Sequence, residues 1–232
     1  MNPNCLEPDR PSTVRVARKS IAATLVGAAG FMVGLGLLSL AQAQALRALG
    51  PLDEQHQVTY YIADGDPDSA YRPADRELAQ WALAAWERNG RGAFHFVPGP
   101  EQTALVRIYW VHAGGGQYGE MQPVIIGGRR GAAVYIRPDT DGLGPDIAEQ
   151  ARSDDLFRDT IVYLTCVHEL GHALGLMHTA NFDDVMYFFG YGGDIVRFFE
   201  RYRERLGKRA DIARNDGVSA GDLEQLHELY GP

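Results

Sequence analysis

The chain has 232 residues, of which 45% are hydrophobic, and a formal net charge of −8 at pH 7. This acidity argues against nucleic acid as a partner and favours solubility. Of the two cysteines only Cys166 lies beyond residue 43, so a disulfide within that part of the chain is excluded.

The first 43 residues have the pattern of an export segment. Arg15, Arg18 and Lys19 precede an apolar run over residues 21–40, and a small-x-small cleavage pattern follows at residues 41–43. The run is long enough for a membrane span, so a cleaved signal peptide and a retained signal anchor both stay open. In either case the basic flank stays in the cytoplasm and the rest of the chain faces outward.

This pattern divides the chain into four parts. We expect a basic segment at 1–20, a signal peptide or signal-anchor helix at 21–43, a short linker at 44–56 and one domain at 57–232. The exported part carries a net charge of −10 and is long enough for one core. It is expected to be secreted or periplasmic after cleavage, and otherwise single-pass membrane-anchored, with membrane contact only through the N-terminal segment.

The first half of the domain alternates strand and helix patterns. Pro73 suits the first turn of a helix that runs to Asn89. Its predicted buried face holds Leu78, Trp81, Ala82, Ala85 and Trp86. Strands are predicted at 58–62, 94–97, 104–111 and 131–138.

An aspartate-rich segment follows the last of these strands. Asp139, Asp141 and Asp146, with two interspersed glycines, could bind calcium, although a polar turn is the more common outcome of such a pattern.

A long helix is predicted next, with Ser153 as its N-cap. Apolar or small residues recur at helical spacing along it: Phe157, Ile161, Leu164, Val167, Gly171 and Leu174.

The end of this helix carries the sequence HELGHALGLMH, residues 168–178. His168 and His172 are four residues apart, so both imidazoles project from one helix face. Gly175 can take the left-handed geometry that ends the helix, which lets the chain turn back and present His178. Three neutral imidazoles leave a fourth zinc position open, as a catalytic site requires. Glu169 lies beside the metal position, where a general base would act on water.

The elongated pattern H-E-x-x-H-x-x-G-x-x-H resembles the metzincin clan of zinc metallopeptidases, and Met186 stands where their Met-turn lies. The spacing from His178 to Met186, the following Tyr187 and the C-terminal segment 218–231 are similar to the matrixin family. The resemblance implies an α+β fold with a mixed twisted sheet, an active-site helix, a Met-turn and a C-terminal helix. It also implies that strand 131–138 is the sheet edge above the zinc, where an extended peptide would pair.

This resemblance implies a zinc-dependent endopeptidase that acts on protein or peptide substrates. His168, His172 and His178 would hold one Zn²⁺, and Glu169 would be the general base for a zinc-activated water. Gly175 and Met186 would support the site. Two alternatives stay open: a non-catalytic binding module on the same scaffold, and a membrane-tethered regulatory protein with a structural zinc.

The chain also departs from the matrixin pattern. The proline after the Met-Tyr pair is absent, and His112 is the only remnant of the cluster that holds a structural zinc in vertebrate matrixins. Residues 194–206 add an amphipathic helix with an apolar stripe of Ile195, Phe198, Phe199, Tyr202 and Leu206. Its opposite face, with Arg197, Arg201, Arg203 and Arg205, is expected to be solvated.

Overall fold

A computed structural model describes residues 50–52, 56–112 and 118–231. The predicted export segment and most of the linker lie outside these residues, so the predicted domain boundaries there stay predictions. Within the described residues, no helix combines the length and the apolar character needed to cross a bilayer.

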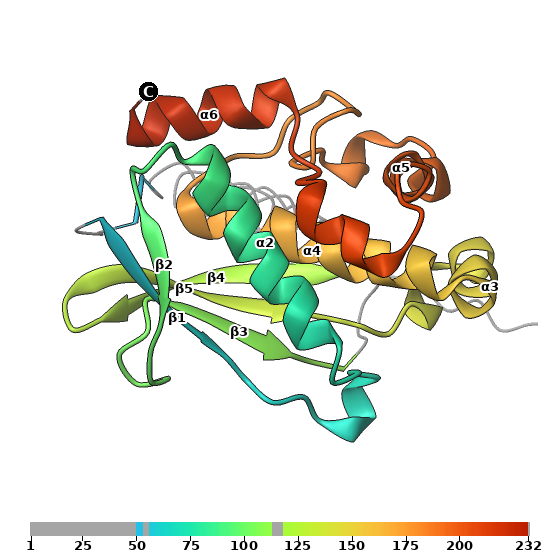
Figure 1. Ribbon diagram of the computed structural model, residues 1–232, viewed down its shortest axis with the longest axis horizontal. Helices are drawn as coiled ribbons and strands as arrows, with labels where there is room; N and C mark the ends of the chain where they lie inside the picture. The colour runs from blue at the N-terminus through green and yellow to red at the C-terminus, as the bar shows by residue number, and fades with distance from the viewer. Residues whose placement is uncertain (1–49, 53–55, 113–117, 232) are drawn as a thin grey trace, which may run out of the picture. The chain divides into compact units, whose positions relative to one another are not determined.

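A five-stranded mixed sheet forms one layer of the domain (Figure 1). Its strands are β1 (Gln57–Ile62), β2 (His95–Pro98), β3 (Val106–Trp110), β4 (Gly119–Ile126) and β5 (Arg129–Ile136), in the spatial order β2-β1-β3-β5-β4. All neighbouring pairs are parallel except β4 with β5, which is antiparallel. This arrangement confirms the α+β fold, and the four predicted strands are present with ends shifted by a few residues.

The sheet edge differs from the prediction. Strand 131–138 corresponds to β5, which is an inner strand between β3 and β4, so its assignment as the edge was wrong. The two edge strands are β2 and β4, and β4 is the one that contacts the helix α4 (Asp155–Leu174). No strand was predicted at β4, whose residues are half-buried or exposed and include Pro123. Proline lacks an N–H donor and is therefore tolerated in edge strands. Gly127 and Gly128 join β4 to β5 with φ of 58° and 81°, as a primed two-residue hairpin turn requires.

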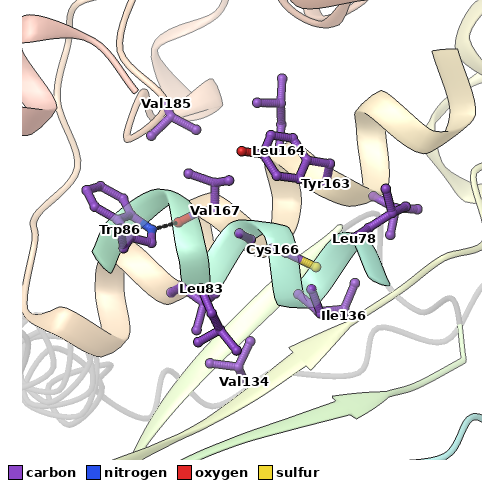
Figure 2. Close-up of a cluster of buried hydrophobic side chains, with 14 of the residues drawn as sticks. Leu78, Leu83, Trp86, Val134, Ile136, Tyr163, Leu164, Cys166, Val167 and Val185 are labelled. Atoms are coloured by element: carbon purple, nitrogen blue, oxygen red, sulfur yellow. Dashed lines mark hydrogen bonds between the residues drawn. The ribbon is translucent and has the colours of Figure 1, made fainter. Parts of the chain in front are cut away.

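Two helices, α2 (Asp75–Asn89) and α4 (Asp155–Leu174), pack together over the sheet (Figure 1). Their contact with the sheet forms the core shown in Figure 2, where Trp86 of α2 donates its indole N–H to the carbonyl of Val167 on α4 at 2.9 Å. The predicted face of α2 is buried except for Trp81, which is partly exposed and lies under the guanidinium of Arg209 at 4.8 Å.

The start of α4 also corrects the prediction. Ser153 is the last residue of a separate short helix, α3 (Pro145–Ser153), and the N-cap of α4 is Asp154. The Asp154 carboxylate accepts hydrogen bonds from the backbone N–H groups of Leu156 and Phe157 at 2.9 and 3.1 Å. A carboxylate caps a helix as well as a hydroxyl does and also interacts favourably with the helix dipole.

Two further helices complete the domain, α5 (Ile195–Arg203) and α6 (Ala220–Tyr230). The predicted extra helix is therefore confirmed, and Phe198, Phe199 and Tyr202 are buried as expected. Three of its arginines form ion pairs, which the predicted solvated face did not include. Arg197 pairs with Glu204, Arg203 with Asp154, and Arg201 with Asp183, because acidic groups of the same helix and of neighbouring segments lie within reach.

Candidate metal centre

Three histidines converge at the C-terminal end of α4. His168 and His172 lie one turn apart on the helix, which ends at Gly175 with φ 103° and ψ 4°. The Gly175 N–H bonds back to the carbonyls of Gly171 and His172, and only glycine adopts this left-handed conformation without steric cost. The chain then reverses and brings His178 to the other two rings, as the sequence predicted.

The geometry of the triad fits a tetrahedral metal ion. The Nε2 atom of His178 lies 3.3 Å from that of His168 and 3.1 Å from that of His172. Tetrahedral ligands with zinc–nitrogen bonds of about 2.05 Å would stand about 3.3 Å apart. The residues present therefore fit zinc, and the three side chains form a group that could hold a metal ion.

The outward ring nitrogens are held by backbone carbonyls. His168 Nδ1 lies 2.6 Å from the carbonyl oxygen of Val185, and His172 Nδ1 lies 2.9 Å from that of Leu176. A carbonyl only accepts, so Nδ1 carries the proton in both rings and the Nε2 lone pairs point towards the shared centre.

Burial keeps these imidazoles neutral. It lowers the pKa of His168 to about 4 and that of His172 to about 3, and it also lowers the pKa of His178. For His168 the hydrogen bond to Val185 opposes the shift, whereas for His172 the neighbouring histidines add to it. Neutral imidazole is the form that binds metal, so the unloaded site is ready for an ion at neutral pH.

Glu169 is buried against the edge strand. Its side chain borders the same cavity as the histidines, and a Cβ atom at Gly119 would come within 2.6 Å of its Cγ. Glycine at this position therefore lets β4 approach the helix. Burial raises the pKa of Glu169 to about 8, the negative charge of Glu120 adds to this, and the positive charge of Arg137 opposes it. A raised pKa makes the carboxylate a stronger base once it is ionised, and a cation bound by the adjacent histidines would favour the ionised form.

The loop that contains Met186 packs directly beneath the triad. Met186 is fully buried, and a Cβ atom at Gly171 would come within 2.5 Å of its sulfur. The buried carboxylate of Asp222, on α6, accepts the N–H groups of Val185 and Met186 at 2.9 and 3.1 Å. Burial raises the pKa of Asp222, and the N–H groups that it accepts oppose the rise. Since Val185 holds the ring of His168, Asp222 orients that histidine through one intermediate residue.

A cavity of about 510 Å³ opens beside the histidines. Its other walls come from β4, from the segment after Met186 and from α5, and they are mainly aromatic and aliphatic. A largely apolar cavity with a few polar groups at one end is typical of a ligand or substrate site.

Other candidate ligands lie away from the triad. Among the described residues, a second group with ligand atoms within 4.8 Å consists of Asp66, Asp68 and His112, all exposed. The aspartates considered for calcium belong to neither group. Asp139 accepts the N–H of Asp141 at 2.9 Å, and Asp141 pairs with Arg152 at 2.9 Å, which are contacts of a polar turn.

Several residues around the triad were not found from the sequence: Gly119, Glu120, Arg137, Val185 and Asp222. Only Asp222 had a local signal, because Ser219 and Asp222 have the spacing of a capping box. That pattern indicates a helix start but not the contact with the Met186 loop.

The mixed sheet, the α4 helix and the triad with its adjacent glutamate together define a metzincin-like domain. A family model described as Matrixin matches residues 52–194, which is more than half of the chain. The chain therefore belongs to the matrixin family.

Curated relatives agree with this assignment. The chain is 29% identical over 185 residues to interstitial collagenase of Sus scrofa and 28% identical over 188 residues to stromelysin-1 of Mus musculus. It is 26% identical over 183 residues to macrophage metalloelastase of Oryctolagus cuniculus. These matches cover 78% of this chain but only about a third of each relative.

Proposed function

We propose that this protein is an exported zinc endopeptidase that hydrolyses peptide bonds. The observation that carries the proposal is the convergence of three imidazole Nε2 atoms at 3.1–3.3 Å beside a buried carboxylate. Membership of the matrixin family supports the same reading.

The histidines have the role of metal ligands in this proposal. His168, His172 and His178 would hold one zinc ion, which when bound supplies a Lewis acid that polarises a carbonyl and makes water more acidic. The carbonyls of Val185 and Leu176 keep the first two rings in the orientation and tautomer that binding needs.

Glu169 has the role of general base. Its carboxylate takes a proton from the attacking water and passes it to the leaving amine. Its burial against Gly119 excludes bulk water from that side and holds the carboxylate at the cavity wall. Glu169 is 7% exposed, which is consistent with a base whose pKa is set by its surroundings.

The peptide backbone would bind along β4. This strand is the edge of the sheet next to the histidines, and an edge strand has unpaired backbone groups that can hydrogen-bond an extended chain. The apolar run and the small-x-small pattern at residues 21–43 support export, with the domain outside the cytoplasm.

The test is cleavage of a protein substrate by the purified chain, full-length in mild detergent or in its naturally processed form. We expect cleavage that a zinc chelator stops and that added zinc restores. Glu169→Gln should lower turnover by roughly 10²–10⁴-fold while one zinc per chain stays bound. Glu149→Gln, on the exposed face of α3, is the matched control and should behave like the wild type.

Three outcomes would contradict parts of this proposal. Cleavage that resists the chelator would contradict the role of zinc. Full activity in Glu169→Gln would contradict the assignment of the base. One bound zinc per chain without cleavage of varied proteins would favour the non-catalytic binding module.

A further inference from the structure

The inner wall of the cavity beside the histidines is aromatic. Phe189 and Phe198 meet edge to face with ring centroids 4.9 Å apart, and Phe198 and Phe199 do so at 5.3 Å. The ring of Tyr118 lies 5.5 Å from that of Phe199. Phe198 and Phe199 come from α5, the helix in the segment that departs from the family pattern.

The charged side chains that line the same cavity are Glu120 and Glu169, and the three histidines line it as well. Phe198 and Phe199 are buried whereas His178 is exposed, so these two rings lie deeper in the lining than that histidine. Among the described residues, the hydroxyl of Tyr118 in the aromatic wall has no hydrogen-bond partner. A charged side chain that entered this aromatic wall would be buried without a partner of opposite charge, which is costly. An aromatic side chain would instead find ring edges and faces to contact.

A second cavity of about 300 Å³ lies behind this wall. It shares Leu164, Val185 and Phe198 with the first cavity, but it is also lined by Arg201, Arg205 and Asp183, of which Arg201 and Asp183 form an ion pair. The guanidinium of Arg201 lies 5.1 Å from the ring centroid of Phe198, and its Nε atom is buried without a hydrogen-bond partner. The ring of Phe198 thus stands between a largely apolar space and a polar one, in which Arg205 is the arginine not paired with Asp183.

We propose that Phe198 is a specificity-determining residue of this site. It makes the cavity take an aromatic side chain next to the scissile bond, and it keeps acidic side chains away from Arg205 in the second cavity. This inference rests on the proposed endopeptidase function. The rings of the wall already contact one another with centroids 4.9–5.5 Å apart. An aromatic side chain that enters the cavity can make edge-to-face contacts with them.

Leucine is the useful comparison. It is apolar but has no ring, so it cannot make the edge-to-face contacts that Phe198, Phe189 and Tyr118 offer. Differences of this kind in an apolar pocket change kcat/KM by about 10–200-fold. We therefore expect peptides with phenylalanine at the selected position to be cleaved at least about tenfold better than those with leucine.

The experiment is digestion of a proteome-derived peptide library by the zinc-loaded protein, with cleavage sites read by mass spectrometry. The wild type should enrich aromatic residues at one position beside the cleaved bond. Phe198→Ala should lose this enrichment and gain glutamate there, because the opening leads to Arg205, which is not paired with Asp183 as Arg201 is. Val196→Ala is the matched control, since Val196 lies on the same helix but does not line the cavity.

A binding measurement separates this inference from the function on which it rests. Saturation-transfer NMR of the Glu169→Gln protein would use N-acetyl-phenylalaninamide and N-acetyl-leucinamide as probes. The phenylalanine probe should bind more tightly, and Phe198→Leu, which keeps an apolar side chain if Phe198→Ala does not fold, should weaken that preference. Absence of cleavage with this binding intact would overturn the endopeptidase proposal but not the pocket. Equal binding of both probes, or an unchanged preference in the Phe198 variants, would overturn the role of Phe198.

Discussion

The two ends of α4 treat polar side chains in opposite ways. At its N-terminal end Arg158, with a side chain that is 4% exposed, donates to both carboxylate oxygens of Asp75, which is fully buried. At its C-terminal end the Nε2 atoms of His168 and His172 face that of His178, and within the described part of the chain no carboxylate or carbonyl is hydrogen-bonded to them. At the N-terminal end the polar groups have hydrogen-bond partners within the protein. At the C-terminal end the three histidine nitrogens direct their lone pairs towards a common point.

This difference separates stability from function. A buried charge pair that is fully hydrogen-bonded resists disruption, because removal of one partner leaves the other charge buried alone. Converging lone pairs contribute little to the free energy of folding until a metal ion binds to them. Their function is to bind that ion. Four predictions test this contrast, in order of decreasing expected effect.

Arg158→Ala should lower the free energy of unfolding by about 3–5 kcal/mol, because Asp75 would be left charged and unpaired in the core. Chemical denaturation of the zinc-free protein measures this. The double variant Arg158→Met with Asp75→Leu should recover most of the loss. A loss below about 1 kcal/mol in the single variant would show that this end of the helix is not held by the pair.

Asp222→Asn should weaken zinc binding by about 10–100-fold without preventing folding. The reason is that Asp222 holds the backbone of Val185, which in turn orients His168. Competition with a chromophoric chelator measures the affinity. Asp211→Asn, which removes a carboxylate that caps a different turn, is the control and should leave zinc affinity unchanged. Equal affinities in the two variants would contradict the relay through Val185.

Zinc affinity should change less than about tenfold between about pH 7.5 and 5.5, because protons compete for imidazole only below its pKa. An ordinary imidazole begins to protonate near pH 6.5, whereas burial lowers the pKa of His168 to about 4 and that of His172 to about 3. Chelator competition across this range tests the prediction. A steep fall in affinity already below pH 6.5 would mean that the rings are not shielded as described.

The same pKa shifts have a consequence for the zinc-free fold. As pH falls below about 6.5, histidines of the unfolded chain bind protons, whereas His168 stays neutral in the folded domain. This preferential protonation of the unfolded chain lowers the free energy of unfolding until pH reaches about 4, where His168 is protonated in the folded domain as well. Glu169 acts in the opposite direction. Its pKa of about 8 in the folded state exceeds its usual 4.5, so its contribution is present below pH 4.5 and is lost as pH rises to about 8.

Arg72→Ala should have the smallest effect, below about 1 kcal/mol on the free energy of unfolding. Arg72 pairs with Asp155 at 2.8 Å at the start of α4, but the two side chains are 50% and 84% exposed. Water and salt screen such a pair. Thermal or chemical denaturation at low and high salt measures the difference, and a loss above 2 kcal/mol would mean that exposed and buried pairs on this helix do not differ as expected.

Local patterns predicted much of the fold. The 3.6-residue period predicted α2, α4 and α5, and the glycine three residues after His172 predicted the end of α4 at Gly175. The role of Met186 came from the resemblance to metzincins. The predictions were wrong where contacts with distant segments determine the burial of a residue or the order of the strands. Trp81 has the period of a buried residue, yet it is half-covered by Arg209, which comes from a distant segment. The family resemblance placed strand 131–138 at the edge, and β4 was not predicted because its sequence, with Pro123, has no clear strand pattern.

The spacing of the three histidines and Glu169 is a property of consecutive residues on one helix and its C-cap, so it could be read directly from the amino-acid order. The surroundings of that motif could not. Gly119 reaches Glu169 from β4, Asp222 reaches the Met186 loop from α6, and Phe198 lines the cavity from α5. Each of these contacts joins segments that are far apart in the chain. Such contacts depend on how the helices pack on the sheet, and no local periodicity encodes them.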